Sequence, residues 1–303
     1  MNNLTKNIIL TPFNWTYKFS PEIVLKILFR IKQGYSLNLE SPKTYNEKLQ
    51  WIKLYDHNSL MPICCDKFTV REFVEQQGCG DILNHLIWEG VNPEDIPFDN
   101  LPEKFVVKVT HGSSFNSICT DKATIDRKDI IAKCKKWIKT KFLPCYGEWF
   151  YGVEKPRVIV EDYIDSGNNE QLIDYKVFCF HGEPRYVRVD SDRFTDHKMD
   201  VFDCEWNYIS GAHMGYKCSE KKFERPKCLE KLMDYASKLS KSFYHARVDF
   251  YIVRDRLYFG EITFTNGAGF DRFSSYEFDL QLGNLLKLPV KRSMNESFGN
   301  RTK

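Results

Sequence analysis

The chain has 303 residues, of which 42% are hydrophobic and 28% charged, and its formal net charge is +3. These proportions are ordinary for a globular protein and exclude a disordered chain, a collagen and a coiled coil. The small net charge gives no reason to expect a nucleic-acid partner. The length is near the upper limit for one hydrophobic core and favours a single enzyme-sized unit of two or three lobes.

No segment has the hydrophobic length of a membrane span. The apolar run over residues 23–29 contains Lys26 and is far shorter than the roughly 20 residues that a spanning helix needs. The N-terminal residues show no signal-peptide pattern. The ten cysteines include no Cys-x-x-Cys pair and are too sparse for a disulfide scaffold. We therefore expect reduced thiols, a cytoplasmic location and at most peripheral contact with a membrane.

The first part of the chain shows helical patterns. A helix is predicted to begin at Pro21, because proline is favoured at the first helical position and Ser20 before it is a good N-cap. Two more helices are predicted over residues 46–55 and 67–74.

Residues 127–141 predict a helix with two different faces. Ile130, Cys134 and Trp137 recur at helical spacing and form a stripe for burial, while seven residues of the segment are lysine or arginine. We interpret the basic residues as a solvated outer face rather than a polyanion-binding site, because basic runs on helices most often keep the helix hydrated.

Strand patterns dominate from residue 104 onward. Strands are predicted at 104–110, 115–119, 157–161, 172–180, 184–189, 201–203, 246–253 and 257–264, with a helix over about 227–243. Short turns at 181–183 and 254–256 make the neighbouring strands antiparallel. Antiparallel sheets with helices packed against them define the α+β class.

Three charged residues lie in or at the end of predicted strands. Lys108 precedes a turn of small residues at Gly112, where its ammonium could meet a phosphate held by the backbone amides of the turn. Lys176 lies within another strand, and Glu161 ends an apolar strand where backbone groups could meet a planar ring. Taken singly, each residue is better explained as a solvent-facing strand residue.

The strongest local pattern is a pair of carboxylates on two strands joined by a short turn. Asp249 and Glu261 can lie side by side in an antiparallel pair, with the Thr263 hydroxyl two residues further on the same face. Two like charges so close are costly without a cation. Three hard oxygen donors of this kind predict a magnesium site.

Seven motifs follow one another along the chain in a specific order. They are SPKTYNEKLQWIKLYD (41–56), DKFTVREFV (66–74), FVVKVTHGSSFN (105–116), IVEDYI (159–164), DYKVFCFHGEP (174–184), RVDFYIVRDRLYFGEITF (247–264) and YEFDLQLGNLLKLP (276–289). Together they resemble the ATP-grasp superfamily. The series is most similar to its TupA-like branch, which is associated with teichuronopeptide and with capsule or O-antigen polysaccharide clusters.

The resemblance covers about residues 35–289 and implies an ATP-grasp fold, in which the nucleotide is held between two antiparallel β-sheet lobes. An N-terminal helical region over 1–65 would precede an ATP-grasp region over 66–289, with the boundary between the lobes near 160–165. A polar, disordered tail is expected over 290–303.

The resemblance also implies a role for individual residues. Nucleotide binding would fall to Lys108, His111, Gly112, Ser113, Ser114, Glu161, Asp162, Tyr163, Ile164 and Lys176. Within this set the two lysines would bind the phosphates, 111–114 would fold over them, and 161–164 would contact the adenine edge and the ribose hydroxyls. Asp249, Glu261 and Thr263 would bind Mg²⁺, although many relatives have asparagine at the position of Thr263. Arg247 would join Lys108 and Lys176 as a catalytic residue.

The activity implied by the resemblance is an ATP-dependent ligation of a carboxylate to an amine through an acylphosphate. ATP and Mg²⁺ would be required, and the carboxylate would belong to a uronic acid of a surface polysaccharide or its precursor, joined to an amino acid or other amine. The sugar half of this expectation comes from the resemblance alone. Candidate contacts to an anionic sugar are Arg185, Arg188, Arg193, Asn266 and Arg272.

Two other functions fit parts of the sequence. A nucleotide-sugar glycosyltransferase could use Asp190-Ser191-Asp192 to bind a metal and a sugar diphosphate, but it leaves the lysines and paired carboxylates unexplained. A catalytically inactive binding module would have lost one of Lys108, Lys176, Asp249 or Glu261, and all four are present. The ligase hypothesis predicts that these four residues converge on one cleft.

Overall fold

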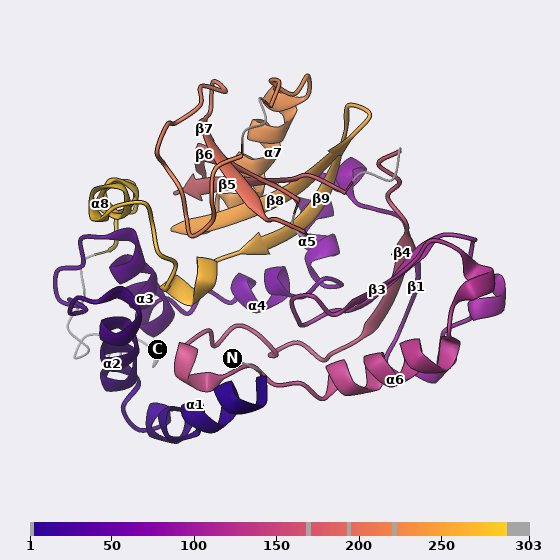
Figure 1. The fold of residues 1–303 in the computed structure, drawn as a ribbon, viewed down its shortest axis with the longest axis horizontal. Helices are drawn as coiled ribbons and strands as arrows, with labels where there is room; N and C mark the ends of the chain where they lie inside the picture. The colour runs from indigo at the N-terminus through magenta and orange to yellow at the C-terminus, as the bar shows by residue number, and fades with distance from the viewer. Residues whose placement is uncertain (1–2, 168–170, 193–194, 220–222, 290–303) are drawn as a thin grey trace, which may run out of the picture.

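The computed structural model describes residues 3–167, 171–192, 195–219 and 223–289, which form two β-sheets flanked by helices (Figure 1). The α+β class expected from the sequence is confirmed. No helix in these ranges has the length and apolarity needed to span a bilayer. The ten cysteines all fall in these ranges and are free thiols. The expected sugar contact at Arg193 and the expected disordered tail over 290–303 lie outside the described residues.

Five helices precede the first strand. They are α1 (Asn3–Tyr17), α2 (Pro21–Gln33), α3 (Tyr45–Tyr55), α4 (Leu60–Cys65) and α5 (Val70–Gln76). The helix predicted to start at Pro21 is confirmed as α2. The helix predicted over 46–55 is confirmed as α3, which begins with a capping box between Thr44 and Glu47.

The third predicted helix starts later than expected. The Asp66 carboxylate accepts hydrogen bonds from the N–H groups of Phe68 and Thr69 at 2.9 and 3.1 Å, which makes a local turn before α5 begins at Val70. This turn lifts Lys67 out of the helix, and the position of Lys67 matters for the site described below.

The first sheet has four antiparallel strands in the order β1-β4-β2-β3. They are β1 (Leu86–Gly90), β2 (Phe105–Val109), β3 (Asn116–Cys119) and β4 (Val158–Asp162). Helix α6 (Arg127–Ile138) packs on this sheet through Ile130 and Cys134, and its exposed lysines form the predicted solvated face. β1 escapes prediction because each of its residues is partly buried and no alternation results.

The second sheet has five antiparallel strands in the order β7-β6-β5-β8-β9. They are β5 (Asp174–Phe180), β6 (Glu183–Ser191), β7 (Lys198–Asp203), β8 (His245–Val253) and β9 (Arg256–Thr263). Both predicted turns are confirmed: His181 and Gly182 have φ angles of 54° and 78°, and Arg254 and Asp255 have 51° and 63°. Positive φ at both central residues is the geometry that keeps a two-residue hairpin tight.

Helices and short turns complete the fold. Helix α7 (Leu229–Ser240) packs on the second sheet, and α8 (Tyr276–Leu285) lies beside α3. The 3-10 turns are η1 (Gly80–Ile82), η2 (Pro93–Asp95), η3 (Phe98–Asn100), η4 (Lys122–Thr124), η5 (Pro144–Tyr146) and η6 (Asn266–Gly269).

The described residues bury two hydrophobic cores. One lies between the first sheet and α6, and the other joins the N-terminal helices to the second sheet and α7. In the larger core the Tyr45 hydroxyl lies 2.8 Å from His245 Nε2, and both residues are buried. His245 Nδ1 donates to the Phe264 carbonyl at 3.0 Å, so Nε2 accepts from Tyr45. Burial lowers the pKa of His245 to about 3, which keeps the ring neutral.

Tyr45→Phe tests the contact between the N-terminal helices and the second sheet. The change keeps the ring but leaves the buried Nε2 of His245 without its donor, so the free energy of unfolding is expected to fall by about 1–3 kcal/mol. Urea denaturation followed by circular dichroism measures the loss. Tyr276→Phe is the matched control, because the Tyr276 ring is half exposed. Equal stabilities for the two variants would contradict the prediction.

Candidate active site

Lys108 on β2 is paired with Glu161 on the neighbouring strand β4. Its Nζ donates to Glu161 Oε2 at 2.5 Å, and Arg71 from α5 donates to Glu161 Oε1 at 3.1 Å. Arg71 is itself fixed by a 2.7 Å bond to the Asn84 carbonyl. The Glu161 side chain is 8% exposed and that of Lys108 is 29% exposed. Glu161 therefore holds Lys108 in one orientation while the ammonium stays accessible to a ligand.

The loop between β2 and β3 is tied to the rest of the protein at several points. A Cβ on Gly112 would lie 2.0 Å from the Phe115 ring, so only glycine fits there. The Phe115 ring stacks on Trp137 of α6 with centroids 5.7 Å apart. His111 lies on the other side of the loop, where its Nε2 donates to the Thr140 carbonyl at 3.0 Å. These contacts hold the loop over 111–114 in place beside Lys108.

Lys67 is a candidate that the sequence analysis did not single out. Its Nζ donates to the Gly112 carbonyl at 2.5 Å, and its backbone N–H donates to the Thr110 carbonyl at 3.1 Å. Burial lowers the pKa of Lys67, and the charges of Glu261, Lys108 and Glu161 all act on its ammonium. Lys67 thus lies within electrostatic reach of both sheets. Its signal in the sequence is the Asp-Lys pair that opens the 66–74 motif.

Lys176 lies at the centre of the second sheet and is surrounded by carboxylates. Its Nζ is 3.1 Å from Asp249 Oδ2, 3.3 Å from Asp174 Oδ1 and 3.4 Å from Asp190 Oδ2. The strand register explains the cluster, because Lys176 is directly opposite Asp249 on β8 and Arg188 on β6. Its side chain is 5% exposed, so its charge is used mainly within the protein.

Asp249 and Glu261 are cross-strand partners on β8 and β9, as the sequence predicts, and Arg247 is directly opposite Thr263. Arg247 donates to both oxygens of Asp249 at 2.6 Å and to Glu261 Oε1 at 3.3 Å. Burial alone would raise the pKa of Asp249, but the positive charges of Arg247 and Lys176 hold it below its usual value. Asp249 is buried, whereas the Glu261 side chain is 45% exposed. The pair therefore has one fixed and one accessible carboxylate.

The donor set of these residues fits a magnesium ion. The described residues contain no group of three or more histidine, cysteine, aspartate or glutamate side chains arranged for a metal. Mg²⁺ does not require one, because it commonly takes one or two carboxylates and fills its remaining positions with phosphate oxygens and water. Asp249 Oδ1 accepts only from the Arg247 Nε among the bonds found, so a lone pair remains there. Glu261 and the Thr263 hydroxyl add further hard oxygens.

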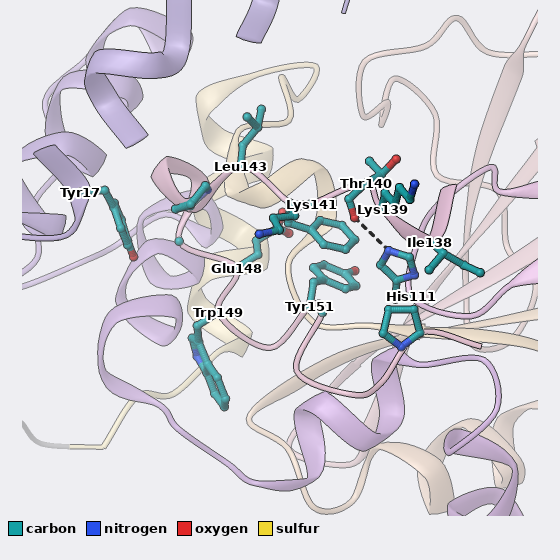
Figure 2. A pocket seen from close by; sticks show the side chains of 15 residues that line it. Tyr17, His111, Ile138, Lys139, Thr140, Lys141, Leu143, Glu148, Trp149 and Tyr151 are labelled. Carbon is teal, nitrogen blue, oxygen red and sulfur yellow. Dashed lines mark hydrogen bonds between the residues drawn. The ribbon is translucent and has the colours of Figure 1, made fainter. Parts of the chain in front are cut away.

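Two adjoining cavities open beside this group. The cavity of about 410 Å³ is lined by Arg247, Glu261 and Thr263 of the second sheet and by Ser113 of the first-sheet loop. The larger cavity, of about 510 Å³, contains none of the predicted metal ligands and lies under residues 138–156 (Figure 2). Its larger volume does not make it the metal site, because Glu261 and Thr263 line the smaller cavity.

A model of the TupA-like ATP-grasp family matches residues 47–287. The chain belongs to this family. The ATP-grasp fold predicted from the motifs is thereby confirmed, with its two antiparallel sheets supplying Lys108 and the Asp249–Glu261 pair respectively. No curated protein matches the chain.

Several solved structures are similar to this ATP-grasp chain. They include D-alanine–D-alanine ligase from Bacillus anthracis complexed with ATP (17% identity, 66% of this chain and 53% of that chain, TM-score 0.38), D-alanine–D-alanine ligase from Helicobacter pylori (14%, 82% and 71%, TM-score 0.42) and L-amino acid ligase from Bacillus licheniformis (13%, 83% and 56%, TM-score 0.44). The chain thus spans about half of the length of the first of these structures.

The expected convergence of four residues is only partly seen in this ATP-grasp chain. Lys176, Asp249 and Glu261 are connected through Arg247, as described above. Lys108 lies on the other sheet, and the bond found for its ammonium is to Glu161. The charges that act on the Lys67 ammonium come from both sheets: Lys108 and Glu161 in the first and Glu261 in the second.

Glu148 is a second residue that the sequence analysis missed. It lines both cavities, and the Thr265 hydroxyl donates to its Oε1 at 2.6 Å. Burial raises the pKa of Glu148, while the nearby Lys53 ammonium acts in the opposite direction. The loop that carries Glu148 has no periodic pattern, so nothing in the sequence marked this carboxylate.

The arginines proposed to contact a sugar have different surroundings. Arg188 is buried and donates to Asp190 Oδ2 at 2.9 Å, within the charged cluster of the second sheet. Arg185 pairs with Glu183 on the surface, and Arg272 donates to the Lys32 carbonyl at 3.2 Å. Asn266 is buried, and neither atom of its amide has a hydrogen-bond partner among the described residues.

The structure corrects the sequence support for a glycosyltransferase. That hypothesis requires the carboxylates of Asp190-Ser191-Asp192 to be accessible to a metal and a sugar diphosphate. Asp190 is instead completely buried and pairs with Arg188 and Lys176. A carboxylate committed to two buried cations is not available to a diphosphate-bound metal, so Asp190 belongs to the charged cluster of the second sheet.

Lys176→Met tests whether Lys176 is essential to the packing of the second sheet. The variant leaves the carboxylates of Asp174, Asp190 and Asp249 short of one positive charge in the interior, and we expect it to lose about 3–5 kcal/mol of unfolding free energy. Urea denaturation measures the loss. Lys238→Met removes an exposed lysine that pairs with Asp234, and this control should leave stability nearly unchanged. A loss below about 1 kcal/mol in Lys176→Met would show that its pairs contribute little.

Proposed function

We propose that this chain is an ATP-dependent carboxylate–amine ligase that forms an amide through an acylphosphate. The carboxylate is that of a uronic acid in a surface polysaccharide or its precursor, and the amine belongs to an amino acid or another amine. The observation that carries the proposal is the group formed by Arg247, Asp249, Glu261 and Thr263, which faces a cavity that Ser113 of the opposite sheet also lines.

The chemistry of amide formation explains these residue types. A carboxylate does not react with an amine at neutral pH, because oxide is a very poor leaving group, whereas phosphate leaves readily from an acylphosphate. The protein must therefore hold the nucleotide phosphates, offset their charge and exclude water. A Mg²⁺ ion held by Asp249, Glu261 and Thr263 supplies positive charge at the phosphates.

Side chains from both sheets contribute to phosphate binding in this proposal. Lys108 approaches from the first sheet in the orientation set by Glu161, and Lys67 supports the loop that supplies backbone N–H groups. Arg247 lines the cavity, and its neighbouring carboxylates keep it charged, so its guanidinium can orient the reacting carboxylate. Lys176 acts indirectly, because its ammonium donates a hydrogen bond that fixes the Asp249 carboxylate.

The smaller cavity also offers features that suit a sugar acid. Phe142, Tyr146 and Phe270 give it flat aromatic walls, and the Thr265 hydroxyl adds a hydrogen-bonding group. The Lys32 ammonium lies 5.2 Å from the centres of the Tyr146 and Phe270 rings, which brings positive charge to this aromatic wall. These features support a flat, anionic substrate. The choice of a uronic acid rests on the resemblance to the TupA-like branch.

A product-mass experiment tests the proposed reaction. The protein is incubated with ATP, Mg²⁺, a panel of uronic acids in free and UDP-linked form, and mixed amino acids. We expect release of ADP and phosphate and a product with the mass of acid plus amine minus one water. Glu261→Gln should lower turnover by about a hundredfold, the scale of losing one preorganised electrostatic contact.

One control variant and one contrary outcome complete the test. Glu72→Gln changes an exposed glutamate on α5 and should leave turnover unchanged. Sugar transfer from a UDP-sugar in the absence of ATP would overturn the ligase proposal in favour of a glycosyltransferase.

A further inference from the structure

The larger cavity adjoins the proposed reaction site through three shared residues, Phe142, Glu148 and Tyr151. The rings of Phe142 and Tyr151 stack with centroids 4.6 Å apart. Figure 2 shows Glu148 and Tyr151 on the same side of this cavity, with His111 and Thr140 beyond them. A molecule in the larger cavity would therefore reach the carboxylate pair by passing Glu148.

Glu148 is held firmly at this junction. Thr265, just after β9, donates to its Oε1, and Glu148 is partly buried. The neighbouring Lys53 ammonium donates to the carbonyls of Tyr146 and Ala268 at 2.7 and 2.6 Å, which clamps the loops on both sides of Glu148. Burial raises the pKa of Glu148, so the carboxylate accepts a proton more readily than an exposed glutamate does.

Positively charged side chains also line this cavity. Lys139 and Lys141 line it just beyond the end of α6, and both are exposed at its rim. Apolar side chains of Ile138, Leu143 and Pro144 contribute to the wall. A cavity lined by a partly buried carboxylate, two exposed lysines and apolar side chains matches the charge pattern of a zwitterion.

We propose that the larger cavity binds the amine substrate of the proposed ligase, and that this substrate is an amino acid. Glu148 receives the ammonium, and Lys139 and Lys141 receive the carboxylate. This inference rests on the proposed function. It assigns the amine to the larger cavity and the activated carboxylate to the smaller one.

The proton balance of the step follows from this placement. Glu148 takes one proton from the ammonium, and the freed nitrogen lone pair attacks the carbonyl carbon of the acylphosphate. A C–N bond forms, the bond from the carbonyl carbon to the phosphate oxygen breaks, and phosphate leaves with the electron pair. The second proton lost by the nitrogen goes to the departing phosphate, and Glu148 later releases its proton to solvent.

The test separates amine binding from carboxylate activation. Hydroxylamine reacts with acylphosphates without a dedicated base, so hydroxamate formation from ATP and the uronic acid panel reports activation alone. Glu148→Gln should keep hydroxamate formation within about twofold and lose at least tenfold in kcat/KM for the amino acid. Calorimetry with individual amino acids and the non-hydrolysable ATP analogue AMPPNP should show at least tenfold weaker binding in the same variant.

Matched variants test the predicted orientation of the amino acid. Lys141→Met should raise the KM for the amino acid and leave that for methylamine, which has no carboxylate, unchanged. Lys135→Met, on the outer face of α6 where it pairs with Glu94, should change neither. If hydroxamate forms but amino-acid binding does not depend on Glu148, this inference alone is overturned. If amino-acid binding depends on Glu148 but no acid gives hydroxamate, the amino-acid site is upheld and the ligase proposal is overturned.

An independent observation concerns the first two helices. On α2, Ile23, Ile27 and Ile31 recur every fourth residue and are 55%, 44% and 64% exposed, while the opposite face of the helix is buried in the core. Trp15 and Phe19, at the end of α1, are 67% and 71% exposed. Figure 1 shows α1 and α2 at the outer edge of the molecule, away from the sheets. Large apolar side chains so grouped on a surface usually mark an interaction site.

The charges around this apolar surface are basic. Lys26 and Arg30 lie on the exposed face of α2, and Lys18 lies between Trp15 and Phe19. The nearby acid, Glu22, is partly buried and accepts a hydrogen bond from the Tyr55 hydroxyl. Apolar and tryptophan side chains flanked by lysine and arginine are the composition of surfaces that lie in the interface of anionic membranes.

We infer that the surface formed by residues 15–31 docks on an anionic lipid membrane. The isoleucines and aromatic rings would enter the boundary between headgroups and acyl chains, and the basic side chains would pair with lipid phosphates. No residue of this segment lines the smaller cavity, whereas Tyr17 lines the larger one, so docking brings the larger cavity close to the membrane.

Co-sedimentation with vesicles tests the docking surface. The protein should bind vesicles of phosphatidylcholine with one quarter phosphatidylglycerol and bind pure phosphatidylcholine at least tenfold more weakly. The double variant Ile27→Glu/Ile31→Glu should abolish binding, with an unchanged circular dichroism spectrum as evidence of folding. Val91→Glu/Val153→Glu is the matched control, because both valines are exposed elsewhere on the surface. Absence of binding to the anionic vesicles, or a wild-type dimer that dissociates in the isoleucine variant, would overturn the inference.

Discussion

Two cations in the second sheet, Lys176 and Arg247, make its charged face possible. Their positive charges lie among Asp174, Asp190 and Asp249, which are buried and would repel one another without them. Because Asp190 and Asp249 lie on the two strands that flank the strand of Lys176, the sheet register and the charge pairing depend on each other. The accessible part of this network is Glu261, and the remainder serves to hold Arg247 and Asp249 in a defined orientation toward the cavity.

The first sheet also contains a group of paired charges, and this group is smaller. Glu161 orients Lys108, and Arg71 binds the other oxygen of Glu161, so this group of three carries one positive charge in excess. The loop at 111–114 is fixed by Lys67, which donates to the Gly112 carbonyl, and by the bond from His111 to the Thr140 carbonyl. A ligand that binds both lysines and Arg247 would therefore connect elements from three distant parts of the chain. In the proposed function, Lys108 and Arg247 recognise phosphate and the substrate carboxylate from strands, and the loops over 138–156 shape the larger cavity.

The sequence allowed a large part of the fold to be predicted because its patterns are local. Alternation in 104–110 and 246–253 identified strands, and the short turns identified hairpins, since turn chemistry needs only adjacent residues. β1 and α4 were missed because the former is half buried throughout and the latter spans only Leu60–Cys65. The start of α5 was misplaced because the side chain of Asp66 competes with the helix for backbone N–H groups.

The sequence by itself determined the pairing of Asp249 with Glu261 and the membership of the ATP-grasp family, because a short hairpin and an ordered series of motifs are both written along the chain. Only the tertiary structure decided that Asp190 is buried, that Lys67 reaches Gly112 and that Glu148 separates two cavities. These depend on which residues, distant in sequence, share a low-dielectric interior. The cost of burying a charge is set by all its neighbours together, and no local pattern records them.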